Sequence, residues 1–259
     1  MGWWLFGSRR FLDADDEAWQ LETWAWLLRQ FGRHRGPREA ALVTPTREFF
    51  PPTELQGHDR AEHVFACVKQ HAGMADWPCE LLAQPRRPER RIGVFWALQP
   101  AGKDMPLGTF AARGNLAVIS YDTAMLDDPQ NLIATLAHEL AHYLLHSVAE
   151  LPPGGEEMEE FATDLAAVYL GFGLFGAATA FRFRQFQDGM SQGWSTSGAG
   201  YLPQRQWVFG LAVFLALRGE TDAAASTFLP SHLRTDLRAA LKYLRRNPGL
   251  LAPVLKGML

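Results

Sequence analysis

The stretch LAHELAHYLLH, from Leu136 to His146, decides how the rest of this chain is interpreted. Three histidines stand four residues apart in it, and a glutamate follows the first of them. On an α-helix, His138 and His142 are one turn apart and point the same way. Because leucines and alanines surround these polar residues, we expect a buried helix, and buried polar side chains need partners.

A metal ion is the partner that this spacing favours. Two imidazole nitrogens on one helix face can bind one zinc ion at about 2.0–2.1 Å. Glu139 is rotated by about 100° from His138, which suits a general base acting on a zinc-bound water. We therefore predict one Zn²⁺ per chain, with His138 and His142 as ligands and Glu139 as the catalytic residue. The direction of His146 has drifted by about 80° from that of His138, so we expect it to pack or support the site rather than bind the ion.

The third metal ligand is expected from the next helix, because a catalytic zinc site usually has three protein ligands. Four glutamates stand there, and only Glu160 has an acid one turn later, Asp164. Asp164 would accept the outer N–H of a ligand histidine. Glu160 is the predicted third ligand, and Glu157 is the main alternative, although Glu157 also fits a solvated helix start.

Composition limits the classes to which the protein can belong. The chain has 259 residues, of which 47% are hydrophobic, enough for one large domain or two small ones. A net charge of −3 without a clustered basic excess predicts no nucleic-acid partner. Cys67 and Cys79 do not make a disulfide framework, and the N-terminal residues lack the order of a secretory signal. We expect a cytoplasmic protein.

One apolar run, residues 165–181, carries no charge and is just long enough to span a bilayer. If Glu160 and Asp164 reach the metal, this run continues their helix, at least up to the pair Gly171 and Gly173, and packs in the core. We therefore expect a soluble protein without membrane association.

The remaining pattern predicts an α+β fold with a small mixed sheet, the helix that carries the histidines, and a C-terminal helical part. A helix should begin at Pro129, capped by Asp128, and two or three more should follow Pro203. The other expected elements are helices at 13–31, 59–71 and from Glu156, and strands at 80–83, 92–98, 109–112 and 116–121. We divide the chain into residues 1–78, 79–188 and 189–259, which can also form one compact domain.

HELAH followed by EFATD resembles the gluzincin zinc metallopeptidases, the broad group that includes thermolysin. From Thr109 to about Leu170 the layout is similar to that of the HtpX-type and CaaX-protease-type members. There an Ala-Phe-Ala-like strand, a turn, an apolar strand and an acidic helix cap precede the motif. HELAHYLLH is also similar to the ImmA/IrrE-type peptidases, which serve in gene regulation. The resemblance covers about a quarter of the chain.

The resemblance implies a zincin-like fold and a role for each matching residue. His138, His142 and Glu160 would bind zinc, Glu139 would be the catalytic base and Asp164 would support a ligand histidine.

The resemblance also implies a substrate-binding strand. An unpaired strand edge can add an extended peptide as a further strand. The residues expected there are Thr109, Phe110, Ala111 and Ala112.

The predicted function is zinc-dependent hydrolysis of a peptide or protein substrate. The alternatives are a regulatory peptidase that cleaves one partner protein and a zinc-stabilised interaction module with little turnover. Glu139 favours catalysis, because zinc binding alone does not require it. Tyr201, Arg205 and His232 are candidates to stabilise the oxyanion, and the sequence does not choose among them. It does not predict an oligomeric state either.

Overall fold

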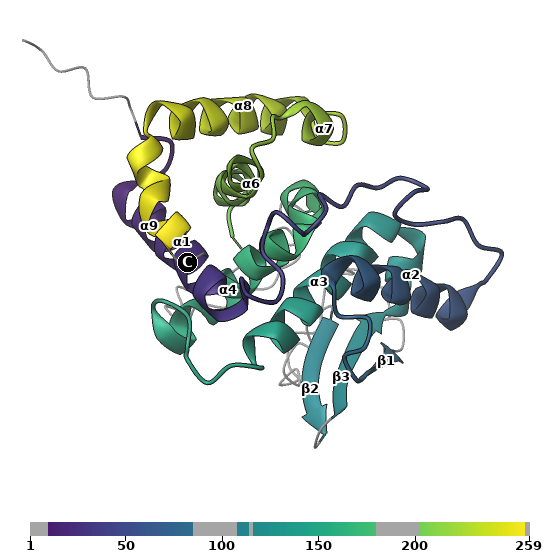
Figure 1. The fold of residues 1–259 in the computed structure, drawn as a ribbon. Coiled ribbons are helices and arrows are strands. Elements are labelled where there is room, and N and C mark those ends of the chain that lie inside the picture. The colour runs from purple at the N-terminus through teal and green to yellow at the C-terminus, as the bar shows by residue number, and fades with distance from the viewer. Residues whose placement is uncertain (1–9, 85–107, 114–115, 180–201, 257–259) are drawn as a thin grey trace, which may run out of the picture.

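The computed structural model describes residues 10–84, 108–113, 116–179 and 202–256 (Figure 1). The fold is mixed α+β, mostly helical, with one small sheet, as the sequence predicts. The elements include two 3₁₀ helices (η1, η2), a π-helix (η3) and a third 3₁₀ helix (η4). In chain order they are α1 (Ala14–Phe31), α2 (Gly57–Ala72), β1 (Cys79–Gln84), β2 (Gly108–Arg113), β3 (Leu116–Asp122), η1 (Thr123–Asp127), α3 (Pro129–Leu145), η2 (Gly155–Met158), α4 (Glu159–Ala167), η3 (Val168–Phe172), α6 (Gln204–Arg218), α7 (Ala223–Ser226), α8 (Ser231–Arg246), η4 (Pro248–Leu251) and α9 (Ala252–Lys256). The predicted strand at 92–98 lies outside the described residues.

The sheet has the strand order β1-β3-β2. Strand β1 runs parallel to β3, with Cys79 opposite Ala117. Strand β2 runs antiparallel to β3, with Thr109 opposite Ser120. Among the described strands, β2 therefore forms one edge of the sheet. The residues predicted to pair with a peptide, 109–112, lie on that edge.

Helix α3 is stabilised both by the cap at its N-terminus and by the burial of its apolar residues. The side chain of Asp128 accepts a hydrogen bond from the backbone N–H of Asn131, and Pro129 occupies the first turn, where its missing N–H costs nothing. Most of the helix from Leu132 onward is buried. It packs on β2 and β3 and lies between α2 and α4. The two histidines thus lie on a helix that is covered by α2 and α4 and by the sheet.

Helix α4 begins and ends differently from the prediction. The chain forms the 3₁₀ helix η2 before α4 starts at Glu159. After Ala167 it changes to the π-helix η3, where Gly171 has a φ of 103°. The backbone N–H of Val43 donates to Gly171 O at 3.0 Å, and a Cβ at Gly171 would collide with Ala41 O. The docked segment 41–43 therefore interrupts the helix at Gly171, the first of the two glycines up to which the sequence predicts it to continue.

The helical stretch Gly155–Thr179 is long and apolar enough to cross a membrane, and no other helix among the described residues is. In its most apolar window, 89% of the residues are buried inside the protein. This burial is typical of the core helix of a soluble protein, as predicted.

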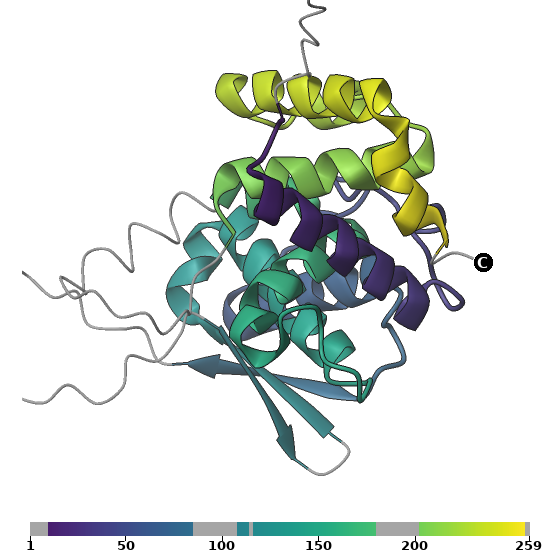
Figure 2. The ribbon, with the colours of Figure 1, turned by 90° about the vertical axis from the view of Figure 1, so that its left-hand side faces the viewer.

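The C-terminal part contains two long helices, α6 and α8, and two short ones, α7 and α9. Helix α6 packs against α4 and η3 on one side and α8 on the other. Helix α9 returns to lie along α1, so the first and last helices of the described chain are neighbours (Figure 2). The buried apolar side chains from α1 through α9 form one continuous cluster. The predicted division at 78/79 falls immediately before β1, and that at 188/189 lies outside the described residues.

Candidate metal centre

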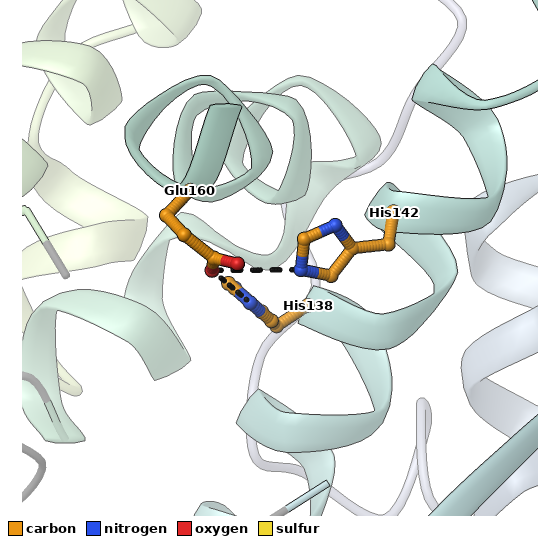
Figure 3. A group of neighbouring side chains, drawn as sticks. All are labelled: His138, His142 and Glu160. Carbon is orange, nitrogen blue, oxygen red and sulfur yellow. Dashed lines mark ion pairs between the residues drawn. The ribbon is translucent and has the colours of Figure 1, made fainter. Parts of the chain in front are cut away.

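Two helices bring three potential metal-binding side chains to one point. His138 and His142 extend from α3, and Glu160 extends toward them from the first turn of α4 (Figure 3). Glu160 Oε2 lies 3.3 Å from His138 Nε2 and 3.5 Å from His142 Nε2. Ligand atoms at 2.0–2.1 Å from one tetrahedral ion are themselves roughly 3.3 Å apart. The spacing of these atoms therefore fits a single metal ion between them.

The outer nitrogens of both histidines are engaged, which fixes the direction of their lone pairs. His138 Nδ1 lies 2.9 Å from Asp164 Oδ1. His142 Nδ1 lies 3.2 Å from the hydroxyl of Thr163, which itself donates to Glu159 O at 2.9 Å. Since that hydroxyl's proton is used, it accepts from His142 Nδ1. In their neutral, metal-binding form both rings then carry their proton on Nδ1 and direct the Nε2 lone pair to the common point.

Asp164 is held in turn by the C-terminal part of the chain. It is 1% exposed, and its second oxygen accepts a hydrogen bond from the backbone N–H of Leu202 at 2.7 Å. The orientation of His138 thus depends on a contact between residues 38 positions apart in the sequence.

The electrostatics of the centre favour a positive charge. Burial disfavours the charged form of His138, but Asp164 and Glu160 outweigh it and raise the pKa of this imidazole to about 10. Hydrogen bonds from His138 and His142 hold the pKa of Glu160 well below its usual range. Without a metal, a proton on His138 supplies the positive charge. A bound cation takes the proton's place and releases it.

Glu139 lies beside the three side chains and is 5% exposed. Burial raises the pKa of its carboxyl group, while the neighbouring imidazoles of His138 and His142 oppose that rise. A carboxylate with a raised pKa is the stronger base and so the better proton acceptor. A cavity of about 20 Å³ borders Glu139 and Thr135, room for about one water molecule.

The structure favours Glu160 over Glu157 as the third ligand. Glu157 is exposed on η2, and the carboxylate within ligand distance of both histidines is that of Glu160. His146 caps the end of α3 and faces Glu159 at 3.5 Å. Among the oxyanion candidates, Arg205 is committed to Phe11 O and Asp236.

The other two candidates are His232 and Tyr201. His232 is exposed at the start of α8, and Tyr201 lies outside the described residues.

Two supporting groups were not predicted, Thr163 and the backbone of Leu202. Every metal-bound imidazole needs an acceptor for its outer N–H. This requirement predicts a group near His142 Nδ1, and Thr163 is that group. A backbone N–H far along the chain has no comparable signal in the sequence.

No family model, curated protein or solved structure matches the chain. A function for this protein therefore has to be inferred from the geometry of the centre itself. The described residues include a group that can hold a metal ion, His138, His142 and Glu160.

Proposed function

We propose that this protein is a zinc-dependent metallopeptidase of the zincin-like type. The observation that carries the proposal is the position of Glu139. Two imidazoles and one carboxylate suit zinc, which takes nitrogen and oxygen ligands in a four-coordinate site and leaves one position open when three come from the protein. A purely structural zinc site needs no buried carboxylate beside its ligands.

Each residue of the centre has a separate task in this reaction. A zinc ion, when bound, lowers the pKa of a water molecule and polarises a substrate carbonyl group. His138, His142 and Glu160 would hold that ion, and Asp164 and Thr163 keep the two imidazoles turned toward it. Glu139 takes the proton from the attacking water and gives it to the leaving nitrogen, so the carboxylate is restored at the end of the cycle.

The edge strand β2 supplies a place for an extended peptide. Strand β3 pairs with one edge of β2, and no other described strand pairs with the opposite edge of β2. Helix α3 packs against β2 and β3. A peptide added along the edge formed by residues 108–113 would form backbone hydrogen bonds without requiring a particular sequence. This arrangement supports a peptide or protein as the substrate.

The test is a comparison of the parent with Glu139→Gln. We expect the variant to keep one zinc per chain and to lose peptide hydrolysis by about 10²–10⁴-fold, the usual contribution of a general base. A broad library of internally quenched peptides reports hydrolysis, and mass spectrometry reports the metal. Glu157→Gln, at an exposed position on η2, is the matched control and should behave as the parent.

Each outcome discriminates between the functions predicted from the sequence. Equal hydrolysis by the parent and Glu139→Gln would refute the mechanism. Zinc binding without cleavage of any peptide, by parent or variant, would instead support the zinc-stabilised interaction module. Cleavage of one protein but no library peptide would support the regulatory peptidase.

A further inference from the structure

The arrangement of two histidines and one glutamate is repeated one helical turn farther along α3. His142 and His146 are again four residues apart, and their ring centroids are 6.2 Å apart. Glu159, the neighbour of Glu160, faces this second pair. Ligand atoms of His142, His146 and Glu159 all lie within 4.8 Å of one another.

The orientation of His146 suits a metal ligand. Its Nδ1 lies 2.9 Å from the carbonyl oxygen of His142. A carbonyl only accepts, so Nδ1 carries the proton and the lone pair is on Nε2. That nitrogen faces Glu159 Oε1 at 3.5 Å. The separation is the same as that between His142 and Glu160 in the inner centre.

We propose that His146 and Glu159 bind a second divalent cation, either zinc or another metal that accepts imidazole and carboxylate ligands. We call this place the outer site and the centre at His138, His142 and Glu160 the inner site. Water molecules complete the coordination of the outer ion, and the ring of His142 lies between the two sites. The proposal concerns metal binding and does not depend on peptide cleavage.

The outer site is more accessible and weaker than the inner one. The side chains of His146 and Glu159 are 51% and 28% exposed, whereas that of His138 is 10% exposed. An exposed pair gains less from charge attraction than a buried one, because water screens it. The outer site has two protein ligands, His146 and Glu159, whereas the inner site has three. It therefore fills only after the inner site, as metal concentration rises.

The test is a zinc titration of the metal-free full chain by calorimetry, with cobalt(II) absorption as a second probe. The parent should bind two equivalents, a tight one and a weak one. His146→Asn, which keeps an N–H donor for the carbonyl of His142, and Glu159→Gln should each lose the weak equivalent only. Cobalt in the inner site should absorb strongly, as four-coordinate cobalt does, and the second equivalent weakly.

Matched controls separate the outer site from general effects of charge. Glu157→Gln removes an exposed carboxylate from η2, and His232→Ala removes an exposed imidazole from α8. Both should keep two equivalents. A parent that binds only a tight equivalent, or a weak equivalent that survives in both His146→Asn and Glu159→Gln, would overturn the proposal and leave these residues as a surface ion pair.

Failure of the inner site gives a different result. If His138→Ala left the weak equivalent in place while no tight equivalent appeared in the parent, the inner site would be wrong and the outer one would stand. If the parent bound one tight equivalent and no second one, and His138→Ala lost the tight equivalent, the inner site would stand and the outer one would be wrong.

Discussion

Helices α3 and α6 are both mostly buried, but they differ in what they bury. The buried residues of α6 are apolar or glycine. They run without interruption from Trp207 to Leu215, and Leu217 follows. Helix α3 buries Thr135, His138 and Glu139 in the same core. An apolar helix needs only complementary shape around it, whereas buried polar groups need specific partners. The comparison teaches that α6 should govern stability and α3 the metal.

The largest effect should come from α6. Phe214 is fully buried, and Phe214→Ala should lower the free energy of unfolding by about 3–5 kcal/mol, through lost burial and the cavity left behind. Urea denaturation measures it. Zinc bound per folded chain should not change. A cost below about 1 kcal/mol, or a loss of zinc from the folded fraction, would break the contrast between the two helices.

Asp164 tests the partners of α3. In Asp164→Asn the amide cannot accept hydrogen bonds from both His138 and Leu202 through two oxygens, so one bond is lost in either orientation. We expect zinc affinity to fall by about 10–100-fold, measured by competition with a chelator. Asp236→Asn, an acid of α8 that contacts Arg205, should leave affinity unchanged. Equal affinity in the parent and Asp164→Asn would remove the aspartate from the centre.

Thr163 gives a smaller effect of the same kind. Thr163→Val removes the acceptor for His142 Nδ1–H but keeps the shape, so zinc affinity should fall by about 3–10-fold, the value of one hydrogen bond. Thr23→Val is the control, because Thr23 makes the same backward bond to its own helix at 2.9 Å. If both variants lost affinity equally, the effect would belong to helix stability instead of the histidine.

The smallest effect is expected in the C-terminal part, at Asp222. Hydrogen bonds from Arg238 and Ser226 lower the pKa of Asp222 from its ordinary value of 3.8. A lowered folded-state pKa means that the carboxylate stabilises the protein above pH 3.8 and that this stability is lost as the pH falls through the folded value. The pair is exposed, so Asp222→Asn should cost less than about 1 kcal/mol at pH 7.

That cost should shrink as the pH falls below 3.8 toward the lowered folded-state pKa. Denaturation curves of parent and Asp222→Asn, measured at a series of pH values, test it. A difference that grew as the pH fell would contradict the assigned direction of the pKa shift.

Helical spacing carried the prediction of His138, His142, Glu160 and Asp164 because all four positions depend on turns within single helices. The same reasoning predicted α3 from its cap at Asp128. It failed where the chain depends on distant contacts. The interruption after α4 depends on a hydrogen bond from the backbone N–H of Val43, which is 128 positions before Gly171 in the sequence. No periodicity in residues 159–172 contains that information.

The same limit explains why the π-helix and Leu202 were missed while the small sheet was predicted. Strands β2 and β3 are neighbours in sequence, and their short β-like runs are a local signal. The contact of Leu202 with Asp164 depends on how the C-terminal part docks, which the sequence pattern does not state.

That docking has a consequence for the thermodynamics of the whole chain. The backbone N–H of Leu202 holds Asp164, and Asp164 holds His138. By reciprocity, whatever the docked C-terminal helices add to the affinity for the metal, the metal adds in equal measure to their docking. Protease resistance around residue 202 should therefore rise with metal concentration. A cut there would therefore weaken a centre whose three proposed ligands, His138, His142 and Glu160, all precede it in the sequence.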